Sequence, residues 1–181
     1  MSERLWIIFF LAGVFLTACG GDDTDKNATA TAAQLRVRNY GIQISGDVVA
    51  DIAVESASAV FLSEPVAHYE LTFEEAGYTV FFTLSERITL GTYRLEAFDE
   101  SLQDQLAAVR ISVPDNAGGT VVYGTPVTGS IILDQAKNTF GGSFDFNATF
   151  IDTGVNQQEV RKTIRVIGTF KDLKADLTPD E

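Results

Sequence analysis

The chain has 181 residues and a formal net charge of −12. This length fits a single domain, and the acidic balance excludes nucleic acid as a partner, because binding it requires a basic face. The chain contains one cysteine and one histidine, which excludes an internal disulfide and a metal site built from several histidines.

The first residues have the composition of an export signal. A short segment that contains Arg4 precedes the uncharged run "LWIIFFLAGVFL" at residues 5–16. A membrane span needs about 20 apolar residues, whereas the apolar part of a signal peptide has about 7 to 15. We therefore expect residues 1–18 to be a signal peptide that is removed on export.

The apolar run ends in "LTAC", Leu16 to Cys19, which resembles the lipobox of bacterial lipoproteins. The resemblance implies that Cys19 is lipidated, that a signal peptidase cuts between Ala18 and Cys19, and that acyl chains such as palmitate anchor the chain in a membrane. Several acyl chains give stable anchoring, whereas one gives only marginal binding. Gly20, where an aspartate would imply retention in the inner membrane, implies an outer-membrane location. The alternative is an uncleaved anchor helix in which Cys19 is simply a small apolar residue.

Residues 19–33 contain no bulky apolar side chain. Such a segment buries too little apolar surface to offset the entropy of ordering it, so we predict a lipidated, disordered tether. Residues 34–181 are predicted to form one domain. Because the chain is acidic, we expect an anionic membrane surface to repel this domain, which would then stand away from it.

Apolar residues recur at every second position through most of residues 34–181, which is typical of strands with one face in a core. Gly77, in "EEAGY", is predicted to close a hairpin between two of these strands. The pattern predicts an all-β fold, a β-sandwich or a jelly-roll-like double antiparallel sheet of about ten strands. Residues 99–108 are the one segment with a helical pattern. The expected strands lie at 40–44, 48–54, 68–74, 77–84, 92–98, 109–113, 120–123, 129–134, 142–150 and 163–170.

The last strands are the most distinctive part of this region. The segment "GSIILDQAKNTFGGSFDFNATF", followed by "VRKTIRVIGTFKDL", resembles the C-terminal strands of uncharacterised all-β bacterial lipoprotein domains. The resemblance implies a fold and no activity. Gly142 and Gly168 are predicted to allow a bulge or a close approach of an aromatic ring. Alternation predicts a core position for Phe144, Phe146, Phe150, Ile164, Val166 and Phe170.

Few residues offer catalytic or metal-binding chemistry. His68 begins a predicted strand and is interpreted as structural. Asp99, Glu100 and Asp104 are weak candidate ligands for Ca²⁺, because they lack the glycine-punctuated spacing of a calcium loop. No cofactor motif is found. The cations Arg161, Lys162 and Arg165 are interpreted as charges that are solvated or protect a sheet edge, rather than as a binding stripe.

The sequence therefore predicts a non-enzymatic, lipid-anchored β-sandwich of the cell envelope with a binding or structural role. Its partners would be the membrane, through Cys19, and an envelope protein or a glycan. One alternative is an envelope glycan hydrolase, which needs two carboxylates about 5 to 10 Å apart. Another is a carbohydrate-binding module, which relies on flat aromatic platforms. An enzyme should show two converging carboxylates in a pocket. An interaction module should instead show an exposed apolar patch or an open edge strand.

Serine in place of Cys19 should abolish attachment of palmitate, because the first acyl chains are joined through the cysteine sulfur. Cells that express the wild-type or the C19S chain are grown with radiolabelled palmitate, and the protein is recovered by immunoprecipitation. The tether variant Thr24→Ser is the control and should keep the label. Label that persists in the C19S chain would contradict the assignment of the anchor.

Overall fold

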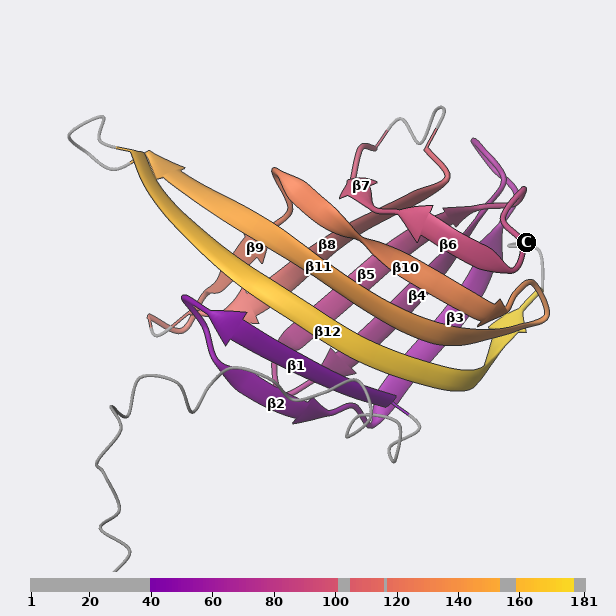
Figure 1. The fold of residues 1–181 in the computed structure, drawn as a ribbon, viewed down its shortest axis with the longest axis horizontal. Coiled ribbons are helices and arrows are strands. Elements are labelled where there is room, and N and C mark those ends of the chain that lie inside the picture. The colour runs from indigo at the N-terminus through magenta and orange to yellow at the C-terminus, as the bar shows by residue number, and fades with distance from the viewer. Residues whose placement is uncertain (1–39, 101–104, 116, 154–158, 178–181) are drawn as a thin grey trace, which may run out of the picture.

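The computed structural model describes residues 40–100, 105–115, 117–153 and 159–177. Its 12 strands form one continuous sheet that folds over on itself into two layers (Figure 1). The fold is therefore all-β and sandwich-like, as the alternation of apolar residues predicted. The predicted signal peptide and tether lie outside the described residues. No membrane-spanning helix is found in the ranges just given.

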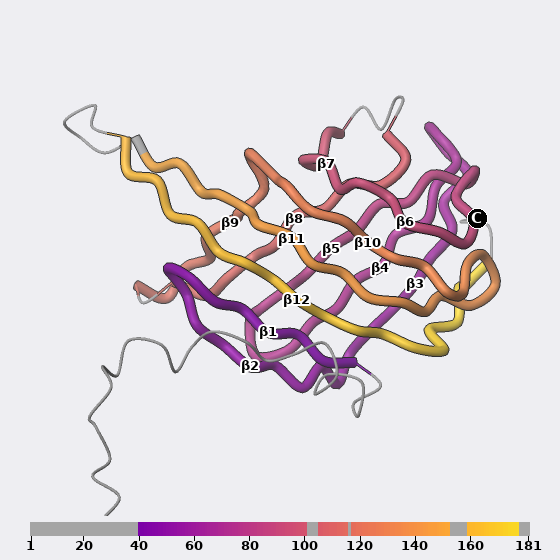
Figure 2. Tube along the Cα trace, viewed as in Figure 1, coloured from indigo at the N-terminus to yellow at the C-terminus, as the bar shows by residue number. Residues whose placement is uncertain are grey.

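The front and rear layers contain six strands each. In spatial order the front layer consists of β2 (Ala50–Ala53), β1 (Tyr40–Gly46), β12 (Glu159–Asp176), β11 (Thr139–Thr153), β10 (Val127–Gln135) and β6 (Gly91–Arg94). The rear layer consists of β3 (Ser56–Leu62), β4 (His68–Glu75), β5 (Tyr78–Ser85) and β8 (Ala107–Pro114), with β7 (Glu96–Ala97) and β9 (Thr120–Tyr123) both paired to β8. Figure 2 shows that the strands of the two layers cross one another.

The two layers share hydrogen bonds at both margins. At one margin, β12 pairs with β11 and β1 in the front layer, and its last residues then pair in parallel with β3 of the rear layer. At the other margin, the Leu95 amide donates to the carbonyl of Gly129 in β10, and the following strand β7 pairs with β8. The chain therefore passes from the front layer to the rear layer at Leu95.

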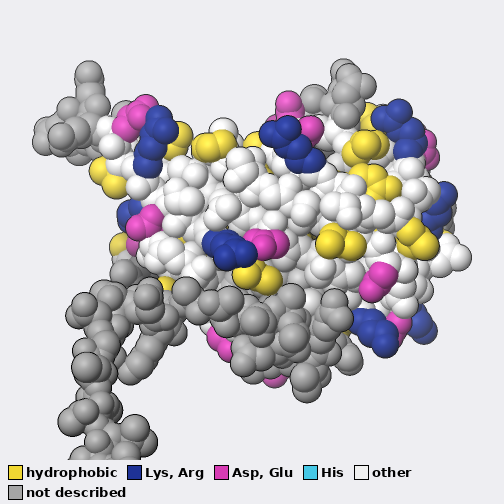
Figure 3. Space-filling model, in the orientation of Figure 1, with side chains coloured by type: hydrophobic (Ala, Val, Ile, Leu, Met, Phe, Trp, Pro, Cys, Tyr) yellow, Lys and Arg dark blue, Asp and Glu magenta, His cyan; other side chains and the backbone are white. Residues whose placement is uncertain are grey.

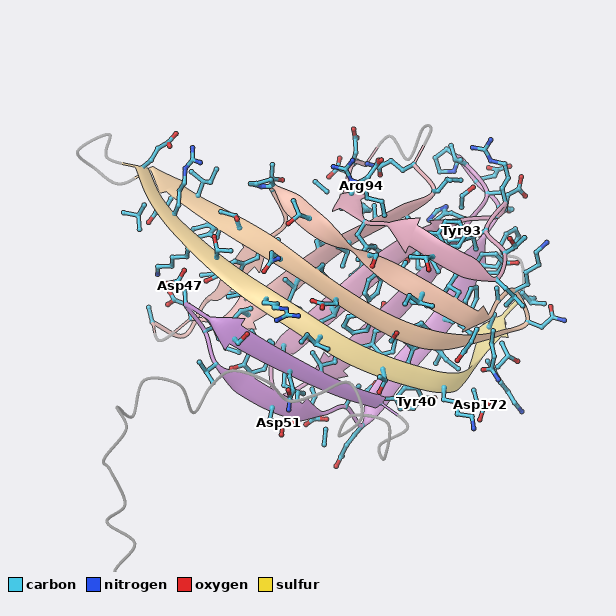
Figure 4. All side chains as sticks on the ribbon, in the orientation of Figure 1. Tyr40, Asp47, Asp51, Tyr93, Arg94 and Asp172 are labelled. Carbon is cyan, nitrogen blue, oxygen red and sulfur yellow. The ribbon has the colours of Figure 1, made fainter. Side chains whose placement is uncertain are left out.

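A bend near the end of β12 makes the first of these crossings. The pairing registers shift between Leu133 and Gln135 and between Phe140 and Gly142, which are bulges. The Gln135 side chain donates to Asp172 Oδ1 at 3.0 Å and accepts from the Asp172 amide at 3.1 Å. Figure 4 labels Asp172 at the bend, where its φ of 58° turns the strand. The bulge predicted at Gly142 is confirmed, and a Cβ there would collide with the Ile132 carbonyl oxygen.

Aromatic rings from both layers fill the core around Phe144. Its ring centroid lies 5.0 Å from that of Phe82 and 6.1 Å from that of Phe73, both in the rear layer. Phe144 also covers Gly168 on the neighbouring strand, where a Cβ would collide with its ring, so the predicted close approach is confirmed. Of the six residues predicted to face the core from β11 and β12, five are at most 2% exposed. Phe150 is half-buried and packs on Tyr123, with a centroid distance of 5.9 Å.

The predicted hairpin is confirmed, with Ala76 and Gly77 at positive φ between β4 and β5. The structure also differs from the sequence pattern in three places. The strand predicted at 92–98 is divided at Leu95 into β6 and β7, which pair in different layers. Strand β3 was not predicted, because in "SASAVFL" only small residues alternate, and the three apolar residues after them are all half-buried. The helix predicted at 99–108 is wrong at its C-terminal end, because the buried residues Ala107 and Ala108 begin strand β8. Residues 101–104 of that segment lie outside the described part of the chain.

Alanine at position 168 should lower the free energy of unfolding by about 1 to 3 kcal/mol, because its methyl group would displace the Phe144 ring from a close-packed core. Urea denaturation of the wild-type and Gly168→Ala chains measures the difference. Gly119→Ala is the matched control, since nothing lies within 4 Å of a Cβ there, and it should change stability by less than about 0.5 kcal/mol. Equal stability of the Gly168→Ala and wild-type chains would contradict this packing.

Candidate functional site

Most of the site residues predicted from the sequence lie outside the described part of the chain. These are Ala18, Cys19 and Asp104. The other candidate Ca²⁺ ligands, Asp99 and Glu100, are exposed just after β7. Among the described residues, no group of three or more His, Cys, Asp or Glu side chains is placed to hold a metal ion.

The cations of β12 lie on the outer face of the front layer. Arg165 forms an ion pair with Asp145 at 2.7 Å, and this hydrogen bond and the charge of Asp145 raise the pKa of Arg165. Arg161 pairs with Glu159 at 3.1 Å. Edge protection is the wrong interpretation for Arg165, because β12 lies between β11 and β1 at that point. Figure 3 shows this face, where most charged side chains lie toward the rim.

A different set of polar side chains gathers on the outer face of the rear layer. Tyr69 and Leu71 of β4 point into the core, so by alternation His68 and Glu70 point outward. In the register, Glu70 lies opposite Thr83 of β5. An outer face of an antiparallel sheet is usually solvated, yet His68 is only 5% exposed and Thr83 only 4%.

Two connecting segments cover these outward-facing side chains. The Ser85 amide donates to the Leu106 carbonyl at 3.0 Å, which ties the end of β5 to the segment before β8. The Glu86 amide donates to the Ala67 carbonyl at 3.3 Å. The Gln105 side-chain amide donates to the Ala97 carbonyl at 2.9 Å, which fixes Gln105 against the end of β7. The outer face is therefore enclosed at this end of the sheet.

His68 is held in one orientation by its backbone neighbourhood. Its Nδ1 lies 2.6 Å from the Val66 carbonyl oxygen. Because a carbonyl oxygen only accepts, Nδ1 carries the proton in this contact, and the ring is fixed. Its Nε2 lies 3.5 Å from Glu70 Oε1, at the limit of hydrogen-bond distance. These contacts are consistent with the structural role predicted for this histidine.

A cavity of about 320 Å³, here called the His68 pocket, lies beneath the covering segments. Two buried polar atoms of residues that line it, Thr83 Oγ1 and Gln105 Oε1, have no hydrogen-bond partner in the described part of the chain. Nearly all buried polar atoms in proteins are paired, and an unpaired one costs about 1 to 3 kcal/mol. The pocket thus offers a hydroxyl group and an amide oxygen to a ligand. The side chains that line it belong to His68, Thr83, Ser85, Glu86, Arg87 and Gln105.

The charges at this pocket are of opposite sign. Glu86 and Arg87 both line it and follow each other in the chain, so the lining has no excess of either charge. Burial raises the pKa of Tyr69, and the charge of Glu86 raises it further. Within the described part of the chain, Glu86 is the one carboxylate among the lining residues.

A second hollow, of about 370 Å³ and here called the Arg110 groove, lies where β8, β9 and the residue Phe98 meet the end of β11 in the front layer. Arg110 of β8 lies opposite Phe81 of β5 in the register. Its guanidinium carbon is 4.6 Å from the ring centroid of Phe81 and 4.6 Å from that of Phe98. The side chains that line the groove include those of Phe98, Arg110, Val122, Thr149, Phe150 and Ile151.

Sequence reasoning did not identify Thr83, Gln105 or Arg110. One signal was present, because "VFFTL" places Phe81 at an outward-facing position beside the core residue Phe82. An aromatic residue on a solvated face indicates that another element covers it. Periodicity could not show that the covering element is the segment between β7 and β8.

No protein-family model matches the sequence, and comparisons with curated proteins and with solved structures find no match. The role of the outer face of the rear layer must therefore be inferred from its own geometry.

Proposed function

We propose that this chain is a lipid-anchored protein of the bacterial cell envelope that binds a small, neutral, polyhydroxylated molecule in the His68 pocket without transforming it. In this proposal Cys19 is the lipid attachment point and the outer membrane is the location, as the lipobox resemblance and Gly20 imply. The observation on which the binding role depends is the pair of buried, unpaired oxygens, Thr83 Oγ1 and Gln105 Oε1.

The pocket's polar atoms and size favour this class of ligand. A ligand hydroxyl can donate to Gln105 Oε1, and a neighbouring one can accept from or donate to the Thr83 hydroxyl. Small-molecule pockets span about 300 to 1,000 Å³, so a cavity of about 320 Å³ suits a molecule of monosaccharide size. The opposite charges of Glu86 and Arg87 favour a neutral ligand over an ion.

Binding is favoured over hydrolysis by the pocket's composition. A glycosidase uses two carboxylates about 5 to 10 Å apart, whereas among the described residues only Glu86 brings a carboxylate to the lining of the His68 pocket. An aromatic platform for a sugar is not favoured either. The large apolar side chains exposed in the described ranges are all valine, leucine or isoleucine. The proposed site is thus a partly open pocket, not a flat surface.

The Thr83→Val substitution tests the pocket without changing its shape. Valine removes an unpaired hydroxyl, so in the absence of ligand the variant should be about 1 kcal/mol more stable to urea than the wild type. The same variant should bind its ligand about tenfold more weakly, because it lacks one hydrogen bond to the ligand. A loss of binding then cannot be attributed to unfolding.

Binding is measured by adding D-glucose, D-galactose or N-acetyl-D-glucosamine to the ¹⁵N-labelled mature chain in a zwitterionic detergent. At least one sugar should shift the amide resonances of Thr83 and Gln105. Thr149→Val is the matched control, because its hydroxyl is paired with Thr163 at 3.2 Å and lies outside the pocket, so sugar binding should not change. The proposal is wrong if no sugar shifts these resonances, or if T83V binds as tightly as the wild type.

A further inference from the structure

The guanidinium of Arg110 lies against two aromatic rings, in the angle that they form on the outer face of the rear layer. The rings of Phe81 and Phe98 are 5.7 Å apart between centroids and inclined at 78° to each other. The Arg110 Cζ atom lies 4.6 Å from each centroid. Contacts of this kind are attractive, because the negative face of a ring faces the cation. They also restrict the rotamers of a side chain that is otherwise exposed.

Arg110 has no acidic partner in the described part of the chain. The arginine ion pairs found there join Arg161 to Glu159 and Arg165 to Asp145, and neither includes Arg110. This is unexpected in a chain with 25 acidic and 13 basic residues. Among the described residues, therefore, no carboxylate accepts from the guanidinium, and its N–H groups can donate to a ligand. A planar carboxylate matches that fork with two parallel hydrogen bonds.

The groove beside Arg110 provides apolar contact surface. Val122 is 51% exposed and Ile151 is 38% exposed, and both line the groove with Phe98 and Phe150. The apolar body of a ligand can lie on these neighbouring side chains. Binding is then favoured, because it removes apolar surface from water. A cation at one position of an apolar groove favours a ligand that combines one negative charge with an apolar body.

We propose that the Arg110 groove binds a small carboxylate attached to an aromatic or branched aliphatic body. The carboxylate forms a bidentate pair with the guanidinium, and the body lies on Val122 and Ile151. The two rings fix the guanidinium in advance, so binding costs little side-chain entropy. This site does not depend on the function proposed above, because the groove and the His68 pocket share no lining residue.

Benzoate and benzamide form a matched pair of probes, because they share size and shape and differ in charge. Each is added to the mature chain at 0.15 M NaCl, where a Debye length of about 8 Å screens most of the repulsion from the protein's net charge. The Arg110 Nε–H resonance reports contact at the guanidinium. Benzoate should shift this resonance and bind about tenfold more tightly than benzamide.

Two variants and a control complete the test. Arg110→Gln should remove the preference for benzoate. Arg110→Lys, which keeps the charge but not the planar fork, should retain only part of it. Arg165→Gln removes an exposed arginine of the front layer and should bind benzoate as the wild type does. An excess of D-glucose should not displace benzoate, which separates this site from the His68 pocket. Equal binding of the two probes, binding of neither, or benzoate binding unchanged in R110Q would overturn the proposal.

Discussion

The two-layered structure depends on the bend near the end of β12. Hydrogen bonds join this strand to β11 and β1 in front and to β3 behind, and a straight strand could not pair with both layers. Paired bulges and the two hydrogen bonds between Gln135 and Asp172 hold the bend. The sheet is thereby closed at one margin, and the rings around Phe144 are enclosed between its layers.

The crossing at the other margin builds the candidate site. After Leu95 the chain leaves the front layer, pairs briefly with β8 as β7, and then contributes Phe98 and Gln105 to the outer face of the rear layer. Phe98 covers one side of Arg110, and Gln105 lines the His68 pocket. The connection that joins the layers thus also contributes lining residues to two hollows, the His68 pocket and the Arg110 groove. Both follow from the path of the chain rather than from a motif.

Local sequence patterns predicted the layers but not the site. Alternation identified the core residues of β11 and β12, and the glycines at 142 and 168 indicated where strands or rings come close. Strand β3 alternates only through its small residues, and at the junction of the layers Val60, Phe61 and Leu62 are all half-buried. By its place in the strand pattern, Thr83 should be solvated, but in the structure the segment before β8 covers it. Such burial depends on contacts between distant segments, which periodicity does not encode.

A crystal structure at atomic resolution, of the chain purified from the membranes of its own cells, shows directly whether the His68 pocket holds a ligand. We expect an ordered organic molecule there, with hydroxyl groups within hydrogen-bond distance of Thr83 Oγ1 and Gln105 Oε1. Ordered water that alone fills the pocket and pairs with both oxygens would contradict this expectation, because the two atoms would then need no ligand.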